Sequence, residues 1–192
     1  VSRRVEGDIH RYTYKEVALR SRKVANALDG MGLAFGDRVA TLFFPNWQSG
    51  RADGNSFAGA LGAEGGGVLT EHFIAEESGL IKLPDSISYS AAATLSCAAL
   101  TAWHSLFEAG DLKPGQTVLL LGTGGVSIYA LQFAKAAGAT VIITSSDDGK
   151  LAHAKQLGAD HGINYRTHPE WQEEVRRLTN GRGVDVVLEV GG

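Results

Sequence analysis

The clearest hydrophobic pattern lies in the last part of the chain, where short apolar runs alternate with longer segments of helical period. The apolar runs are Thr117–Leu121, Thr140–Ile143, Gly162–Tyr165 and Val184–Val190. The helical segments are Ile128–Ala137, Gly149–Leu157 and Pro169–Leu178. Strands without polar alternation are buried on both faces, and strands separated by helices indicate a parallel sheet. The pattern therefore predicts an α/β fold with a four-stranded, partial doubly wound (Rossmann) parallel sheet.

The amino-terminal segment combines one predicted helix with one predicted strand. Thr13–Glu16 has the Ser/Thr-x-x-Glu form of a capping box, which marks the start of a helix. The residues that follow at alternating steps of four and three are Val17, Ser21, Val24, Leu28 and Met31. Gly30 and Gly32 end this helix, and Val39–Phe44 follows as a short apolar strand. We expect a short α+β segment ahead of the sheet.

Three segments connect these two parts. Residues 45–67 are rich in Gly, Asn, Ser and Asp and have no sustained period, which predicts a loop or linker. Residues 68–83 alternate loosely and predict one or two strands. Tyr89–Ala109 is apolar nearly all round and dense in helix formers, so we expect two packed helices there.

Composition excludes several classes of function. The chain has 192 residues, of which 44% are hydrophobic and 20% charged, without an apolar run long enough to span a membrane and with a charged amino terminus. We therefore expect a cytoplasmic protein. A net charge of −3 argues against nucleic acid or an anionic membrane as partner. Residues 1–38 carry eight basic against five acidic side chains, which indicates a solvated helix face or, alternatively, a basic arm.

A glycine-rich turn joins the first predicted strand to the first predicted helix. It comprises Gly122, Thr123, Gly124, Gly125 and Val126, followed by Ser127. The first glycine permits a tight turn, the next allows the backbone to approach a pyrophosphate, and the helix amino terminus offers unpaired N–H groups. Serine replaces the third glycine of the usual fingerprint. The strand-turn-helix context still predicts a dinucleotide site.

The end of the second strand bears on cofactor choice. An NAD enzyme places an acid there to bind the ribose 2′-hydroxyl, whereas this chain continues into Ser145 and Ser146. Small hydroxyls leave room for a 2′-phosphate, and Lys150 follows within a turn of the next helix as a counter-charge. Asp147 and Asp148 favour NAD if either turns inward, although acids also cap helices. We predict NADP ahead of NAD.

Residues 44–192 resemble the medium-chain dehydrogenase/reductase superfamily, which contains the zinc alcohol dehydrogenases and quinone oxidoreductases. The matching motifs are Trp47–Arg51, Leu80–Pro84, Ala91–Leu95, Leu100–Trp103, Gly122–Val126, Ala134–Ala139, Lys150–Leu151, Leu157–Asp160, Asn164–Tyr165 and Gly181–Asp185. The resemblance implies that Thr101 lies near the nicotinamide and that Ser146, Lys150 and Tyr165 surround the 2′-phosphate. The alternatives are a backbone-bonded hydroxyl for Thr101 and a packed aromatic ring for Tyr165.

Cys97 stands where the zinc-dependent relatives have a catalytic zinc ligand. A catalytic zinc needs three protein ligands, and in those enzymes the others come from an earlier domain that the resemblance does not cover. The chain holds one cysteine, and its six histidines form none of the usual metal-binding groupings. We therefore expect no zinc, and a buried, inert thiol at Cys97.

Residues 1–42 are similar instead to the amino-terminal part of acyl-CoA synthetases. Tyr14–Glu16, Ala25–Leu28 and Gly32–Ala40 carry that similarity. It suggests three parts: residues 1–43 like an acyl-CoA synthetase, 44–84 as the tail of a GroES-like catalytic domain, and 85–192 as a carboxy-terminally truncated nucleotide-binding domain. We expect no ligase chemistry, because the family's ATP-binding loop has no counterpart downstream.

The function that the resemblance to the dehydrogenase/reductase superfamily implies is hydride transfer between NADP(H) and a small carbonyl, alcohol or quinone. No catalytic residue is assigned, because the segments that would carry substrate are not recognised in the chain. We expect an incomplete, weakly active chimera that associates through an exposed fourth strand, as a homo-oligomer or an aggregate. The alternatives are an acyl-CoA ligase and a nucleotide-binding fragment without activity.

Overall fold

The computed structural model describes residues 2–3, 9–10, 36–47, 50–63, 66–70 and 72–191. The predicted helix between Thr13 and Met31 lies outside these residues. The chain divides into two compact units, Val1–Ala93 and Thr94–Gly192, which we call the first and second units. Among the described residues, no helix is long and apolar enough to cross a membrane.

The described residues of the first unit form two small antiparallel sheets. In one, β1 (Ser2–Arg3) pairs with β2 (Ile9–His10). In the other, β3 (Val39–Thr41) pairs with β4 (Leu80–Lys82), which follows the 3-10 turn η1 (Glu77–Gly79). The predicted strand from Val39 is therefore present but shorter, and the described residues between 68 and 83 form one strand, within the predicted one or two.

Arg38 fastens the segment that follows β4. Its guanidinium donates a 2.8 Å hydrogen bond to the Pro84 carbonyl and lies 5.3 Å from the centre of the Tyr89 ring. Tyr89 opens the short helix α2 (Tyr89–Ala92), whose N-cap is Ser88, the side chain of which accepts a hydrogen bond from the Ala91 N–H. A cation over an aromatic ring and a filled cap both favour this local geometry.

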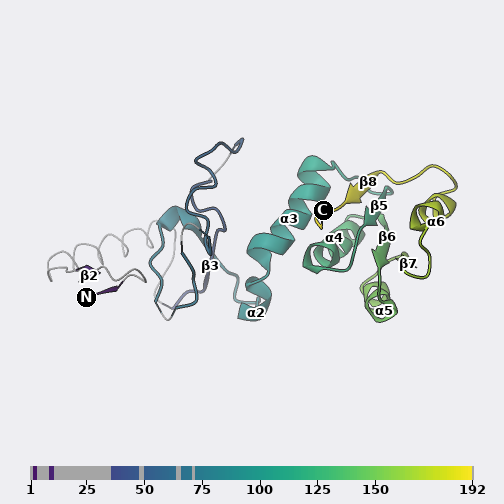
Figure 1. Cartoon of the computed structure of the whole chain (residues 1–192). Helices are drawn as coiled ribbons and strands as arrows, with labels where there is room; N and C mark the ends of the chain where they lie inside the picture. The colour runs from purple at the N-terminus through teal and green to yellow at the C-terminus, as the bar shows by residue number, and fades with distance from the viewer. Residues whose placement is uncertain are drawn as a thin grey trace. The chain divides into compact units, whose positions relative to one another are not determined.

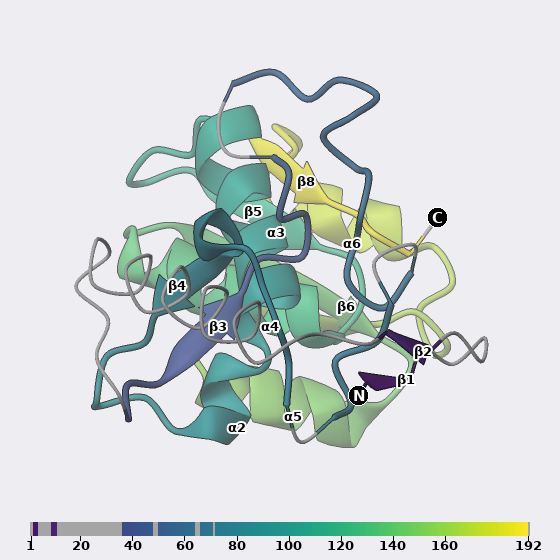
Figure 2. The same ribbon diagram turned by 90° about the vertical axis from the view of Figure 1, so that its left-hand side faces the viewer.

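The second unit confirms the predicted parallel sheet. Its four strands are β5 (Thr117–Leu120), β6 (Thr140–Ser145), β7 (His161–Asn164) and β8 (Val186–Leu188). They lie in the order β7-β6-β5-β8, and every neighbouring pair is parallel. Figure 2 shows β8, in yellow, beside β5. This is the first half of a doubly wound sheet.

Helices cover both faces of this sheet, which explains why its strands lack polar alternation. They are α4 (Gly125–Ala136), α5 (Asp148–Gln156) and α6 (Trp171–Leu178), and Figure 1 shows α4 and α6 flanking the strands. Val118 and Leu120 belong to a core shared with α4 and α5, whereas Leu119, between them, packs in a second core with Val175 of α6. Alternate residues of one strand are thus buried on opposite sides.

The segment Tyr89–Ala109 differs from the prediction of two packed helices. Apart from α2, it forms one continuous helical stretch that alternates between π-helical and α-helical turns. Its parts are η2 (Leu95–Ala99), α3 (Leu100–Trp103) and η3 (His104–Ala109). Ala99, Ala102 and Leu106 are buried at helical spacing, and α4 packs against this stretch, while Leu100 and Trp103 are exposed. Packing therefore buries only one face of this segment, although its sequence is apolar nearly all round.

Candidate functional site

The glycine turn leaves β5 and opens α4 as predicted. Gly122 has a φ of +86°, a left-handed conformation that favours glycine, and its N–H donates a 3.1 Å hydrogen bond to Thr144 Oγ1. Gly124 is the N-cap of α4, where no side chain caps the helix and no acid lies in the first turn. The N–H groups at this helix end are therefore left without a side-chain acceptor, which is the arrangement that binds phosphate.

The turn has room for a phosphate next to the backbone. A Cβ atom built on Gly122 or Gly124 would meet no other atom within 4 Å, so open space lies beside both residues. A Cβ on Gly125 would lie 3.6 Å from the Ala98 Cβ, because η2 packs there. Ser127, at the third fingerprint position, is 2% exposed and its hydroxyl donates to the Leu121 carbonyl at 3.3 Å. The serine therefore points back to the strand end and leaves the turn open.

The carboxyl end of β6 brings the predicted hydroxyls to this turn. Thr144 and Ser145 are buried, and Ser145 Oγ lies 3.1 Å from Thr123 Oγ1. The Asp147 N–H donates to Ser145 Oγ at 3.3 Å, and Ser146 between them is half-buried. These bonds join the turn after β5 to the turn after β6, which places two predicted binding segments side by side.

The two acids after Ser146 are engaged in local bonds. Asp147 is the N-cap of α5, and its Oδ1 accepts a 2.8 Å hydrogen bond from the Lys150 N–H. Asp148 Oδ1 accepts a 2.7 Å bond from Asn164 Nδ2. The Lys150 side chain is exposed and forms no ion pair within the described residues. Asp147 therefore caps α5 and Asp148 links α5 to β7, while the charge of Lys150 remains available to bind an anion.

An open pocket of about 510 Å³ lies at this edge of the sheet. Its lining residues are Thr123, Ile128, Asp147, Gly149, Lys150 and His153. It brings the predicted residues Thr123 and Lys150 together. Our sequence prediction missed Ile128 and His153, although the spacing could have indicated both. Ile128 is in the first turns of α4 after Gly125, and His153 is three residues after Lys150 on α5.

The other predicted residues lie outside the lining of this pocket. Val126 is half-buried in the first turn of α4. Tyr165 is 43% exposed, and its N–H donates to the Ser145 carbonyl at 3.0 Å, so the backbone rather than a packed ring fixes its place at the end of β7. Thr101 is half-buried in α3, and its side chain forms no hydrogen bond within the described residues.

The prediction of a buried thiol at Cys97 is wrong, because the side chain is exposed. Its neighbours Ala98 and Ala99 turn toward the unit's interior: Ala98 faces the start of α4 and Ala99 is 6% exposed. Cys97 consequently lies on the outer side of this helical turn. Within the described residues, no group of three or more His, Cys, Asp or Glu side chains is arranged to hold a metal ion. The donor set therefore does not fit a zinc centre.

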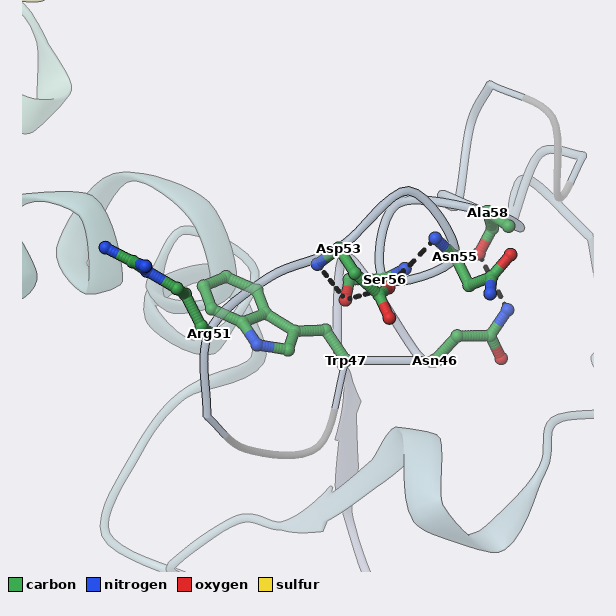
Figure 3. Close-up of a pocket in the computed structure, with 7 residues that line it drawn as sticks. All are labelled: Asn46, Trp47, Arg51, Asp53, Asn55, Ser56 and Ala58. Atoms are coloured by element: carbon green, nitrogen blue, oxygen red, sulfur yellow. Dashed lines mark hydrogen bonds between the residues drawn. The ribbon is translucent and has the colours of Figure 1, made fainter.

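A second open pocket, of about 500 Å³, lies in the first unit. Figure 3 shows its lining residues, Asn46, Trp47, Arg51, Asp53, Asn55, Ser56 and Ala58, with the Arg51 side chain pointing away from Asp53. Bonds within the loop occupy most of its polar groups. Asp53 Oδ1 accepts from the N–H groups of Asn55 and Ser56 and from the Ser56 hydroxyl, each at 2.9 Å.

These bonds identify Asp53 as a residue that folds the loop. The hydrogen bonds from the Ser56 side chain and backbone, and then from Asn55, lower the pKa of the Asp53 carboxyl. Asn46 Nδ2 donates to the Ala58 carbonyl and Trp47 Nε1 to the Gly50 carbonyl. Because these polar groups hold the loop in shape, we place the candidate site at the glycine turn.

Comparison with known proteins points to the same region. Residues 125–192 match the family of zinc-binding dehydrogenases. A zinc-type alcohol dehydrogenase-like protein of Schizosaccharomyces pombe is 45% identical over 166 residues, which cover 85% of this chain and 48% of that protein. The chain is therefore similar to zinc-type dehydrogenases of the medium-chain dehydrogenase/reductase superfamily. The family match begins at Gly125, within the glycine turn, and includes the hydroxyl-rich end of β6.

Solved structures of this superfamily agree. A protein from Sinorhizobium meliloti 1021, described as an alcohol dehydrogenase, has 46% identity and a TM-score of 0.76, covering 82% of this chain and 47% of that one. An NAD-dependent alcohol dehydrogenase has 38% identity and a TM-score of 0.70, covering 81% and 47%. The chain thus spans about half the length of the relatives that it matches. The match to the Schizosaccharomyces pombe protein covers 85% of this chain. Residues 44–192 make up a smaller part of the chain than that, so the match also includes residues before Phe44.

Proposed function

We propose that this chain forms the NADP(H)-binding part of an oxidoreductase of the alcohol dehydrogenase or quinone reductase type. The observation that supports it most is the open glycine turn at Gly122 and Gly124, which meets the hydroxyls of Thr123 and Ser145 and the Lys150 side chain at one edge of the sheet. In a doubly wound fold this edge, outside the carboxyl ends of the strands, is where a dinucleotide binds.

Each group has a separate part in binding. The first N–H groups of α4 hold the pyrophosphate, and Gly122 and Gly124 let it approach the backbone. Ser145, Ser146 and Lys150 receive the 2′-phosphate, beside Tyr165, and Thr101 lies toward the nicotinamide. When bound, the nicotinamide supplies or accepts a hydride. The described residues offer no set of side chains that could hold a zinc ion.

The positions of the two aspartates favour NADP over NAD. Asp147 is turned into the cap of α5 and Asp148 toward Asn164, so neither is committed to a ribose 2′-hydroxyl. Small hydroxyls and an unpaired lysine suit a phosphate dianion better. Because one similar structure is an NAD-dependent alcohol dehydrogenase, the two cofactors must be compared directly.

The test is a titration of the purified chain with NADPH and with NADH, followed by cofactor fluorescence and by thermal unfolding. We expect tighter binding of NADPH and about a tenfold loss of that preference in Lys150→Ala, since a charge-assisted bond to phosphate is lost. Lys155→Ala is the matched control, because it removes the same charge near the other end of α5, and Lys155 forms no ion pair within the described residues either.

Activity is tested separately, by following NADPH oxidation with small aldehydes and with quinones. Turnover supports the hydride-transfer proposal and shows which substrate class the chain accepts. Binding without turnover favours a nucleotide-binding role alone. Equal affinity for NADH and NADPH, unchanged in Lys150→Ala, contradicts the NADP assignment.

A further inference from the structure

One arginine of the second unit stands apart from the others. Arg176 pairs with Glu173, Arg177 with Glu174 and Arg182 with Asp185, each three residues apart. Arg166 is exposed and forms no ion pair with any described residue of the chain. An exposed arginine without an ion pair adds little to the stability of the fold. Its position in the fold is therefore the better guide to its role.

Arg166 leaves the sheet at the carboxyl end of β7, in a turn that is held by hydrogen bonds. Its backbone N–H donates to Asn164 Oδ1 at 3.0 Å, and the His168 N–H donates to the Asn164 carbonyl at 2.9 Å. The Thr167 hydroxyl donates to the same carbonyl at 3.2 Å. Asn164 itself is 8% exposed. The backbone from which the Arg166 side chain starts is therefore fixed relative to β7.

The same turn is tied to the proposed 2′-phosphate site from two directions. The Tyr165 N–H donates to the Ser145 carbonyl at 3.0 Å, which joins the ends of β7 and β6. Asn164 Nδ2 donates to Asp148 Oδ1 at 2.7 Å, and Asp148 lies in the first turn of α5, two residues before Lys150. Figure 1 shows α5 next to β6 and β7, with which it makes contact. Lys150 and Arg166 thus start from two elements that adjoin the end of β6.

We propose that Arg166 is a second cation for the 2′-phosphate of NADP(H) and a specificity-determining residue for the cofactor. This inference rests on the proposed function. A guanidinium presents a planar fork that binds two phosphate oxygens at once, whereas a lysine ammonium acts as a point charge. Neither cation gains much from the uncharged 2′-hydroxyl of NADH. The two residues together therefore select the phosphorylated cofactor.

The experiment measures the affinity of the whole chain for four probes by calorimetry: NADPH, NADH, 2′,5′-ADP and 5′-AMP. The last two differ only in the 2′-phosphate. We expect Arg166→Ala to weaken NADPH and 2′,5′-ADP about tenfold, which is roughly 1.4 kcal/mol, and to leave NADH and 5′-AMP unchanged. Arg166→Lys should recover part of the loss, because it keeps the charge without the fork.

Arg176→Ala is the matched control, since it also removes one exposed arginine but from the last turn of α6. It should leave all four affinities unchanged. Thermal unfolding of each variant checks that the fold is retained, which we expect because the Arg166 side chain holds no described partner. Higher salt should weaken binding of 2′,5′-ADP less in Arg166→Ala than in the natural chain, because fewer charges remain to be screened.

The outcomes separate this inference from the proposed function. If the natural chain binds 2′,5′-ADP more tightly than 5′-AMP and Arg166→Ala does so equally well, the proposed function stands and the Arg166 assignment is overturned. If the natural chain does not distinguish the two probes, the NADP(H) proposal fails, and the Arg166 inference fails with it. A loss for Arg166→Ala that extends equally to 5′-AMP also overturns the inference, because it indicates a general disturbance of the site.

Discussion

The parallel sheet in the second unit carries different groups at the two ends of its strands. We call the side where the strands begin the amino edge and the side where they end the carboxyl edge. At the amino edge, carboxylates hold the strands where they begin: Asp160 accepts a 2.7 Å hydrogen bond from the Val141 N–H and pairs with Lys135 at 2.8 Å. Asp185 accepts a 2.7 Å bond from the Thr117 N–H and is clamped by Arg182. At the carboxyl edge lie glycines, hydroxyls, the N-cap residue Asp147, and two cations that form no ion pair within the described residues.

This difference shows how one sheet combines stability with binding. Charged groups at the amino edge are satisfied by the protein itself, so they stabilise the fold and have little capacity left for a ligand. The open N–H groups and the side chains of Lys150 and Arg166 at the carboxyl edge have no partner among the described residues and are therefore suited to an anion. Substitutions at the amino edge should change stability alone, and those at the carboxyl edge should change binding.

The largest expected effect comes from a pair of glycines that flank β5. Gly115 and Gly122 have φ values of +83° and +86°, and a Cβ on either would meet no atom within 4 Å. Valine at either position should therefore cost a similar strain of about 2 kcal/mol in the free energy of unfolding. Only Gly122→Val places a side chain where the pyrophosphate approaches, so it should also weaken NADPH binding by more than about tenfold.

Urea unfolding and NADPH titration of the two variants test this pair together. Gly115→Val is the control, because it carries the same strain at the opposite edge. Loss of NADPH binding in Gly115→Val to the same degree would contradict the division between the edges. Retained binding in Gly122→Val would remove the glycine turn from the proposed site.

The amino edge also shows what the sequence could and could not predict. The motifs Leu157–Asp160 and Gly181–Asp185 were identified only through family resemblance. Their structural role was hidden because Asp160 bonds to a residue 19 positions away and Asp185 to one 68 positions away. The sheet, by contrast, was predicted correctly, because buried parallel strands and the helices between them produce hydrophobic patterns among residues that are close in sequence.

The candidate site was predictable where one continuous segment carries it, as at Gly122–Val126 and Ser145–Ser146. Prediction failed where tertiary contacts decide which side of a helix is buried. Leu95–Ala109 is apolar nearly all round, so its sequence does not reveal that Cys97, Leu100 and Trp103 are exposed. Arg166 was missed for a related reason: its significance comes from the absence of an acid partner, which only the folded arrangement shows.

The second prediction concerns acid stability and belongs to the amino edge. Partial burial raises the pKa of Asp160, but hydrogen bonds from Lys135 and the Val141 N–H, with the lysine charge, lower it below its ordinary value overall. A hydrogen bond from Arg182, and then one from the Thr117 N–H, lower the pKa of Asp185. A lowered pKa in the folded state stabilises the fold above the unfolded pKa, near pH 4, and this stabilisation is lost as the pH falls through the folded pKa.

The free energy of unfolding should therefore fall below about pH 4, and Asp160→Asn should lose about 1 kcal/mol near neutral pH and show a shallower fall in acid. The expected loss is only about 1 kcal/mol because the side chains of Lys135 and Asp160 are 31% and 35% exposed, so solvent weakens their interaction. NADPH affinity at neutral pH should be unchanged in this variant. If the free energy of unfolding of Asp160→Asn fell as steeply in acid as that of the natural chain, Asp160 would not contribute to the stability of the amino edge.

The smallest expected effect is at Asp147, which both caps α5 and lines the carboxyl-edge pocket. Asparagine caps a helix as well as aspartate does, so Asp147→Asn should keep the 2.8 Å bond from the Lys150 N–H and leave the free energy of unfolding nearly unchanged. It removes a negative charge beside the proposed phosphate, and exposed charges a few ångströms apart interact weakly. NADPH should bind about two- to threefold more tightly, and NADH should be unaffected. Weaker NADH binding with unchanged NADPH binding would instead assign Asp147 to a ribose hydroxyl, and would make the carboxyl edge an NAD site.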